Sequence, residues 1–289
     1  MPEPAVRSLG RFRLHAIDAG RLRLDGGAMF GVVPKPLWER KIEADGRNRI
    51  PMALRCLLVE TSDELVLVDT GVGNKEDEKF RDIYGIENEG EPTALEDAIR
   101  AAGFDPAAVS LVINTHLHFD HAGGDTVRRD DGAVVPSFAD VRHVVQRGEW
   151  EFAHLDNERV RASYLSHNMD PVFEEGLFDL AEGRVEVMPG ITVVPTPGHT
   201  PHHQSVLIES DGERALYLAD LVPTATHLPL PWIMGYDVEP LVTLETKHAV
   251  LGEAKRERTL LIFEHDPDTA WGYLDPNEER PTLVQERPD

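Results

Sequence analysis

Short apolar runs separated by polar turns recur along the chain and predict a protein rich in β-strands. The turns carry Gly, Asp and Ser, which favour reversal of the backbone. Ser210-Asp211-Gly212-Glu213, for example, is expected to join two strands as a hairpin, and a first pair is expected around Asp18-Ala19-Gly20. The predicted strands cover residues 12–17, 22–24, 53–60, 64–68, 109–114, 141–146, 185–187, 191–194, 205–209, 214–218 and 259–263.

Four segments between these strands predict helices. Residues 93–102 have Thr93 at the N-cap and Gly103 just beyond the last turn, both favourable helix ends. The other predicted helices cover residues 149–154, 158–164 and 240–253. Each half of the chain therefore contains strands followed by covering helices, with no linker between the halves. This pattern predicts one domain over residues 1–289, of the α/β (α+β) class, built from two similar β-rich halves.

Residues 25–52 interrupt this plan, because they are punctuated by Gly and Pro and are predicted to be irregular. They nevertheless carry large apolar side chains, among them Met29, Phe30 and Trp38. A long apolar loop is more typical of a lid, a pocket wall or a dimer contact than of a flexible linker. Ordinary core packing is the alternative for these three side chains.

The bulk composition excludes some classes of partner. The 29 Lys and Arg residues against 52 Asp and Glu give a net charge of −23, which repels nucleic-acid phosphates. The single Cys56 lies in an apolar run and is expected to be a buried strand thiol. We expect no signal peptide and no membrane span, since no apolar stretch approaches about 20 residues. A cytoplasmic location is therefore the expectation.

The segment from Thr115 to His121 holds the densest group of metal-ligand side chains in the sequence. His116 and His118 are two residues apart, so both rings leave the same side of an extended backbone, and Asp120 and His121 follow on the turn. Such a group could serve two adjacent metal ions, which indicates hydrolysis by a metal-bound hydroxide. The alternative is a solvated, histidine-rich loop.

Further polar side chains follow the ends of other predicted strands. Asp69, His199, Asp220 and His265 each come just after an apolar run. Any one of them could be an ordinary loop or turn residue. If the strand ends lie along one edge, however, all four side chains would gather with the histidine cluster around a shared site.

With these motifs in place, the chain resembles the metallo-β-lactamase superfamily over nearly its whole length. The resemblance rests on Asp69-Thr70-Gly71, His-x-His-x-Asp-His at residues 116–121, Thr196-Pro197-Gly198-His199-Thr200-Pro201, Asp220 and His265. It implies a four-layer αββα sandwich with two central mixed sheets flanked by helices. Asp69 would orient a ligand histidine by accepting its free N–H.

The resemblance also implies two divalent metal ions. One would be bound by His116, His118 and His199, and the other by Asp120, His121 and His265, with Asp220 bridging them. Nitrogen and oxygen ligands of this kind suit zinc, although iron, cobalt and manganese accept them too.

Within the superfamily, residues 24–38 and 115–122, Ala219-Asp220 and the stretch near Tyr236-Asp237 resemble the YtnP-type probable quorum-quenching lactonases. This resemblance implies ring opening of N-acyl-homoserine lactones by a metal-bridging hydroxide, with Asp120 or solvent protonating the leaving alkoxide. It also implies a homodimer formed through the N-terminal loop. The expected substrate pocket comprises Met29, Phe30, Trp38, His227 and Tyr236.

One position departs from the pattern of many acyl-homoserine lactonases. Three residues after the bridging aspartate they have a tyrosine, whereas this chain has Pro223, so His227 or Tyr236 would have to substitute for it. Alternative substrates for the same site are an organophosphate of the methyl-parathion type and a thioester of the glyoxalase II type. A nuclease is disfavoured by the net charge. A flavo-diiron redox protein is disfavoured by His118 and by the lack of a following flavin domain in this sequence.

Overall fold

The structure, a computed structural model, describes residues 5–287, and the chain divides into two compact units. Unit 1 contains Met1–Arg21 and Leu54–Gly183, and unit 2 contains Leu22–Ala53 and Arg184–Asp289. Each unit has its own strands and helices, as two similar halves require. That the two act as one domain stays a prediction.

The described residues form two large mixed sheets of seven strands and one small hairpin. In spatial order, the first sheet contains β1 (Ala5–Leu9), β2 (Phe12–Asp25), β3 (Arg49–Glu60), β4 (Leu65–Val68), β5 (Val109–Ile113), β8 (Arg142–Gln146) and β9 (Phe178–Ala181). The second contains β10 (Val185–Met188), β11 (Ile191–Pro195), β12 (Gln204–Ser210), β13 (Glu213–Tyr217), β14 (Leu260–Ile262), β15 (Trp271–Leu274) and β16 (Leu283–Val284). β6 (Thr126–Arg128) pairs with β7 (Val134–Pro136).

Seven α-helices accompany the sheets in the described residues. They are α1 (Gly26–Phe30), α2 (Lys35–Trp38), α3 (Glu78–Tyr84), α4 (Ala94–Ala101), α5 (Arg147–Ala153), α6 (Ser166–Glu174) and α7 (Pro240–Arg256). The two mixed sheets and their helices confirm the predicted fold class. Within residues 5–287, no helix combines the length and the apolar character needed to cross a membrane.

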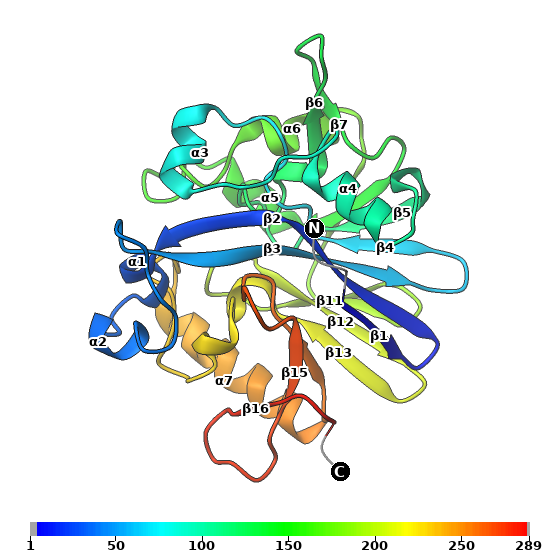
Figure 1. Cartoon of the computed structure of the whole chain (residues 1–289). Coiled ribbons are helices and arrows are strands. Elements are labelled where there is room, and N and C mark those ends of the chain that lie inside the picture. Colours follow the sequence, from blue (N-terminus) through cyan, green and yellow to red (C-terminus); the bar gives the residue numbers. More distant parts are fainter. Residues whose placement is uncertain (1–4, 288–289) are drawn as a thin grey trace. The chain divides into compact units, whose positions relative to one another are not determined.

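In unit 1, the central strands consist largely of buried apolar residues. All four residues of β4 are buried, as are four of the five in β5. β4 runs parallel to β5, β5 parallel to β8, and β8 parallel to β9, which is typical of strands covered on both faces. Figure 1 shows helices α3, α4, α5 and α6 together on one side of β4 and β5.

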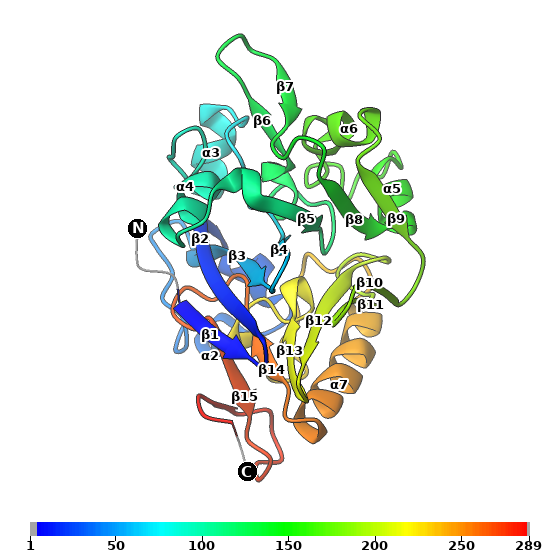
Figure 2. The ribbon, with the colours of Figure 1, turned by 90° about the vertical axis from the view of Figure 1, so that its right-hand side faces the viewer.

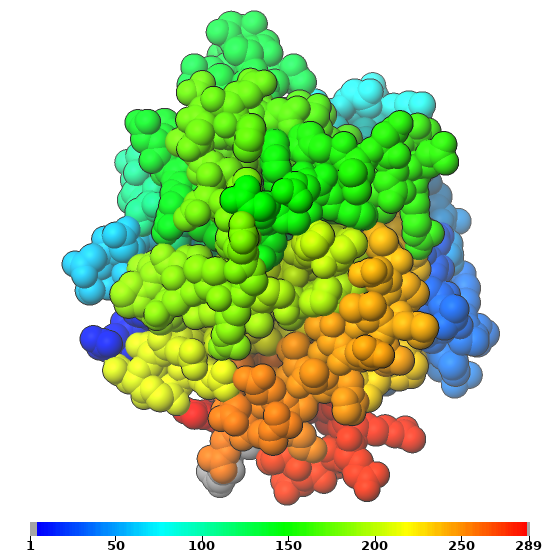
Figure 3. All heavy atoms as spheres, turned by 180° about the vertical axis from the view of Figure 1, so that it is seen from behind, coloured from blue at the N-terminus to red at the C-terminus, as the bar shows by residue number. Residues whose placement is uncertain are grey.

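In unit 2, helix α7 covers the second sheet, as Figure 2 shows. Leu251 and Ala254 of α7 join a buried cluster with Leu207, Leu216 and Leu261 from the strands. The helix starts with Pro240 in its first turn and ends with Lys255 and Arg256, which suit the two ends of the helix dipole. Residues 240–256 lie within the orange part of the surface in Figure 3.

Three sequence predictions about elements are wrong. Residues 12–25 form the single strand β2 instead of two strands, because Gly20 takes φ of +121° within a strand that stays extended. Residues 158–164 form turns instead of a helix, and the carbonyl of Ser163 accepts a hydrogen bond from the amide of Phe119. Residues 25–52 are less irregular than expected, since they contain α1, α2 and the start of β3.

Candidate metal centre

The parallel strands of unit 1 bring the first group of predicted ligands together. β4, β5 and β8 are parallel neighbours, so their carboxyl ends lie at one edge of the sheet. Loops that follow such ends converge and commonly form ligand sites in α/β proteins. β4 ends directly before Asp69, and β5 ends two residues before Thr115. The topology therefore brings the Asp69 carboxylate to the loop that holds the histidines.

The four predicted metal ligands of unit 1 lie together in this loop. The ring centroid of His116 is 4.5 Å from that of His118 and 3.9 Å from that of His121. Asp120 Oδ1 is 3.9 Å from His121 Nε2. All four side chains are buried. The carbonyl of His118 accepts hydrogen bonds from the amides of His121 and Ala122 at 3.0 and 2.9 Å, and this tight turn brings the second half of the motif back onto the first.

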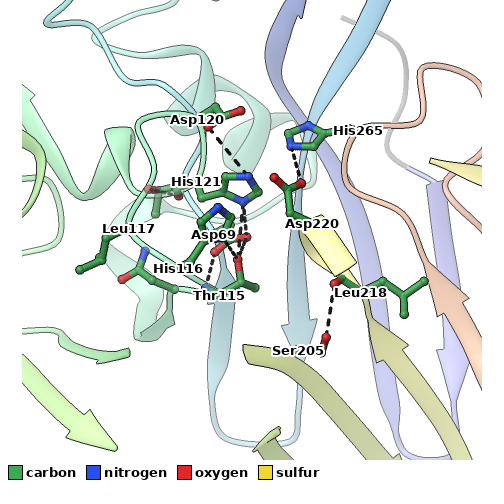
Figure 4. A network of polar contacts seen from close by, with 12 residues as sticks. Asp69, Thr115, His116, Leu117, Asp120, His121, Ser205, Leu218, Asp220 and His265 are labelled. Carbon is green, nitrogen blue, oxygen red and sulfur yellow. Dashed lines mark hydrogen bonds and ion pairs between the residues drawn. The ribbon is translucent and has the colours of Figure 1, made fainter. Parts of the chain in front are cut away.

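Asp69 orients His121 through a small network of hydrogen bonds (Figure 4). Its Oδ2 lies 3.0 Å from His121 Nδ1 and accepts the hydroxyl of Thr115 at 2.8 Å, while its Oδ1 accepts the amide of Thr115 at 2.7 Å. Asp69 adopts φ of +54°, a left-handed backbone that is uncommon for a residue with a side chain. The network holds Nδ1 of His121, which is how a carboxylate commonly orients a ligand histidine.

A buried layer of polar groups fixes the other end of the loop. Thr70 Oγ1 lies 2.9 Å from Asp125 Oδ1, and burial raises the pKa of Asp125 to about 7. Lys75 Nζ donates to the carbonyl of Thr126 at 2.7 Å and to that of Gly123, and burial lowers its pKa to about 8. A side chain at Gly123 would overlap the backbone of residues 71–72, so only glycine fits at this position.

Unit 2 contributes a second group of predicted ligands at its own strand ends. β13 runs parallel to β14, and Asp220 and His265 follow these two strands. Asp220 lies between two imidazoles, with Oδ2 at 3.0 Å from His199 Nε2 and Oδ1 at 3.2 Å from His265 Nε2. Figure 4 shows the Asp220–His265 contact. Ala219, just before Asp220, takes φ of +46°, the same left-handed geometry as Asp69 at the end of β4.

Each histidine of unit 2 is held by its other ring nitrogen. His199 Nδ1 lies 3.0 Å from Asp237 Oδ1, and His265 Nδ1 lies 2.8 Å from the carbonyl of Ala53. Burial opposes a charged His199, but Asp220 and Asp237 outweigh it and raise the pKa of this histidine to about 10. Asp237 lies in a stretch that resembles the lactonases, but the sequence pattern gave it no role. Its part in orienting His199 depends on a contact across 38 residues.

This donor arrangement fits divalent metal ions. Ligand histidines typically donate one ring N–H to a carboxylate or carbonyl and present the other nitrogen to the metal, which is the pattern of His121, His199 and His265. Without a metal, each of the two contacts between a histidine Nε2 and an oxygen of Asp220 requires a proton between the nitrogen and the oxygen. A metal ion bound by these donors would displace such protons.

A sequence profile of the metallo-beta-lactamase superfamily matches residues 53–269, a span that contains all seven predicted ligands. The chain belongs to the metallo-beta-lactamase superfamily. The resemblance inferred from the sequence motifs is thereby confirmed at the level of the superfamily.

Individual superfamily members are similar to this chain over most of its length. The N-acyl homoserine lactonase AiiA of Bacillus thuringiensis subsp. kurstaki is 29% identical over 264 residues, which cover 88% of this chain and 93% of AiiA. A probable metal-dependent hydrolase from Staphylococcus aureus is 28% identical, with a TM-score of 0.88 over 98% of this chain and 99% of that one. An N-acyl homoserine lactone hydrolase, solved with N-hexanoyl-L-homoserine at its catalytic metal centre, is 25% identical, with a TM-score of 0.66 over 91% and 95% of the two chains.

The predicted pocket residues of unit 2 divide into two groups by solvent exposure. Met29, Phe30, Trp38 and His227 are almost completely buried, whereas Tyr236 is 37% exposed. The ring of Phe30 stacks between those of His227, at 4.5 Å, and Trp38, at 5.2 Å. This stack belongs to the packed interior of unit 2, so the alternative of core packing accounts for four of the five side chains.

The contacts of His227 do not suit it to replace the tyrosine that many acyl-homoserine lactonases have at the position of Pro223. His227 Nε2 lies 2.9 Å from the carbonyl of Met29 and its Nδ1 2.8 Å from Thr224 Oγ1, so both ring nitrogens have partners inside unit 2. Burial lowers its pKa to about 3. Pro223 itself has a structural contact, because its carbonyl accepts the amide of His265 at 3.0 Å.

An aromatic cluster that the sequence did not predict lies beside the metal loop. Phe80 and Tyr84 of α3 each have ring centroids 4.9 Å from that of Phe119, which lies between His118 and Asp120. Burial, together with the charge of Asp120, raises the pKa of Tyr84. The spacing of residues 80 and 84 along one helix face was an available signal, but α3 itself was not predicted.

Proposed function

We propose that this protein is a metal-dependent hydrolase that opens the lactone ring of N-acyl-homoserine lactones. The observation that carries the proposal is the oriented set of metal ligands, in a superfamily member that is similar to named lactonases over most of its length. A structure 25% identical to this chain, with the ring-opened product at its metal centre, supports the same substrate class.

We further propose that the two groups of ligands form one centre for two divalent ions. His116, His118 and His199 would bind one ion, and Asp120, His121 and His265 the other. Asp220 would bind both, because each of its oxygens faces a different histidine. Zinc suits this set of nitrogen and oxygen donors best, and iron, cobalt and manganese are the alternatives.

Such a pair of ions supplies Lewis acidity and a water of low pKa. The residues of the chain then have defined tasks in the hydrolysis. Asp69 and Asp237 hold His121 and His199 in the ring orientation that ligation requires. As water adds to the carbonyl carbon and the ester C–O bond of the ring breaks, Asp120 or solvent would accept the proton that this water loses and return it to the leaving alkoxide. One water is consumed, and an N-acyl-homoserine results.

The acyl chain of the substrate needs an apolar surface next to this chemistry. We propose that Phe80, Tyr84 and Phe119 provide it, since Phe119 directly precedes Asp120 in the metal loop. This assignment replaces Met29, Phe30 and Trp38, whose side chains are occupied in packing against one another and against unit 2. Tyr236, which is partly exposed, remains a proposed pocket residue.

Two further proposals concern the protein as a whole. We propose that it acts in the cytoplasm and that it forms a homodimer through residues 25–52. The exposed side chains of Val32 and Leu37 in this segment, 91% and 49% exposed, suit such a contact. Light scattering of the wild type and of a Val32→Glu variant tests the dimer, which the charge should dissociate.

The activity is tested with protein of defined metal content and four substrates: a long-chain and a short-chain N-acyl-homoserine lactone, paraoxon and S-lactoylglutathione. We expect the lactones to be hydrolysed with the highest kcat/KM. Faster turnover of paraoxon or of the thioester would replace the proposed substrate by one of the alternatives. His118→Ala and Asp220→Ala should lose both bound metal and turnover, while an exposed control, Asp130→Asn, should retain both.

A further inference from the structure

The backbone of the metal loop is tied down on both sides of His118. The amide of Leu117, between the two histidines, donates to Oε1 of Glu149 at 3.2 Å. The amide of Phe119, on the other side, donates to the carbonyl of Ser163 at 2.9 Å. Leu117 is labelled beside His116 in Figure 4. The position of His118 is thus set by two contacts to segments that follow it by about 30 and 45 residues in the sequence.

Glu149 is a carboxylate with no solvent access. Its side chain is 0% exposed, although charged residues are rarely buried without a strong reason. The oxygen that receives the Leu117 amide also accepts the hydroxyl of Tyr164 at 2.7 Å. Glu149 lies in the first turn of α5, where the helix dipole favours a negative charge. A fully buried acidic side chain that accepts two hydrogen bonds marks a position that the fold maintains.

Tyr164 links this carboxylate to a metal ligand. Its ring packs edge-on against the imidazole of His118, with centroids 4.7 Å apart and planes at 66°. The side chain is 7% exposed, so it has little freedom to move. The hydroxyl on Glu149 and the ring on His118 therefore fix the distance between α5 and this imidazole.

The strand order explains why Glu149 reaches the loop at all. β8 pairs in parallel with β5, and the amide of Asn114 donates to the carbonyl of Val144 at 2.9 Å. β5 leads into the metal loop, and β8 leads into α5. The two segments consequently leave the same edge of the sheet side by side, which brings the Glu149 carboxyl group within hydrogen-bonding distance of the Leu117 amide.

We propose that Glu149 and Tyr164 are positioning residues for the His116-x-His118 ligands. Glu149 fixes the backbone between the two histidines, and Tyr164 fixes the ring of His118 and the acceptor oxygen of Glu149. We assign neither residue a contact with the substrate or the ions. The inference rests on the proposed metal centre, but it concerns metal binding and does not depend on which ester or lactone is hydrolysed.

The test measures stepwise binding of Co²⁺ by chelator competition, the ligand-field spectrum of the cobalt protein, and unfolding of the metal-free protein. Glu149→Ala should lower the affinity for one of the two ions by about tenfold or more and should change the cobalt spectrum. Glu149→Gln should restore most of the affinity, because an amide oxygen can still accept from Leu117 and Tyr164. Glu151→Ala, an exposed substitution in the same helix, is the matched control and should match the wild type.

Tyr164→Phe keeps the ring against His118 and removes only the hydroxyl, so it decides the question if Glu149→Ala does not fold. It should shift the cobalt spectrum and lower the affinity while the metal-free protein unfolds cooperatively. Wild-type affinity and spectrum in Tyr164→Phe, or in a folded Glu149→Ala, would overturn the inference, as would equal impairment by Gln and Ala. A wild type that binds no metal would instead refute the proposed function.

Discussion

Replacing Asp237 by asparagine should weaken metal binding without unfolding unit 2. Asp237 and His199 are each 2% exposed, and their contact of 3.0 Å joins a carboxylate to the ring nitrogen that faces away from Asp220. A hydrogen bond to a charged group contributes about 1.5–3 kcal/mol, against about 0.5–1.5 kcal/mol for a neutral one. The amide keeps an acceptor and loses the charge, so the difference of about 1–1.5 kcal/mol corresponds to an affinity lower by about tenfold.

The pH dependence of this effect provides a second check. In the metal-free protein the pKa of His199 is about 10, so a proton competes with the metal below that pH. Asp237→Asn lowers this pKa, because one of the carboxylates that raise it becomes neutral. Proton competition is then weaker in the variant at neutral pH, which offsets part of its lost affinity. The gap between variant and wild type should therefore widen as the pH rises toward 10.

The assay is a competition titration with a chelator at several pH values, in parallel with denaturant unfolding of the metal-free protein. Asp237→Ala should show a larger loss than Asp237→Asn, and Asp130→Asn, on an exposed loop, should show none. The reasoning is refuted if Asp237→Asn binds both ions as tightly as the wild type at every pH. A gap that narrows with rising pH would contradict the assigned role of His199 protonation.

Three further predictions concern stability. Burial lowers the pKa of Lys247 from 10.5 to about 7, so between these pH values the unfolded chain holds a proton that the folded protein has released. The free energy of unfolding should therefore rise by about 1.4 kcal/mol per pH unit over this range. Urea titrations of Lys247→Met should lack this rise. Burial lowers the pKa of His143 to about 4, so between pH 6.5 and 4 the unfolded chain binds a proton that the folded protein does not. The free energy of unfolding should therefore fall by up to about 3 kcal/mol as the pH drops over this range. Metal-free His143→Leu should show a shallower fall, and an unchanged profile would contradict the assignment. Trp38→Ala should lower the free energy of unfolding, measured with denaturant, by about 3–5 kcal/mol without changing the acyl-chain preference. A changed preference would indicate that Trp38 lines the substrate pocket.

The strands that carry the ligands were largely predictable because each is short, apolar and bounded by turn residues. The predicted strand over residues 109–114 is β5, and the predicted hairpin at 210–213 joins β12 to β13. The predicted helix over 240–253 is α7, which continues to Arg256. Helix α3 was missed, because it is only seven residues long and none of its residues is buried, which leaves little apolar periodicity to detect.

The pocket prediction for residues 25–38 rested on a weaker physical signal. Apolar content in a Gly- and Pro-rich segment indicates burial, but it does not say what covers the side chains. Phe30 and Trp38 are covered by each other and by His227 and Trp232, which come from a distant part of the sequence. The aromatic side chains that do lie at the metal loop, Phe80 and Tyr84, come from a helix that the pattern did not reveal.

The sequence by itself determined which side chains are candidate metal ligands, because a ligand must carry a nitrogen or oxygen donor and must follow a strand that can deliver it. It also determined the superfamily, since these motifs occur in a fixed order. Only the tertiary structure decided how the ligands are oriented. Asp237 on His199, and Glu149 and Tyr164 at the metal loop, act through hydrogen bonds and ring contacts across 15 to 46 residues. No local pattern encodes such contacts, because they depend on which strand ends share an edge.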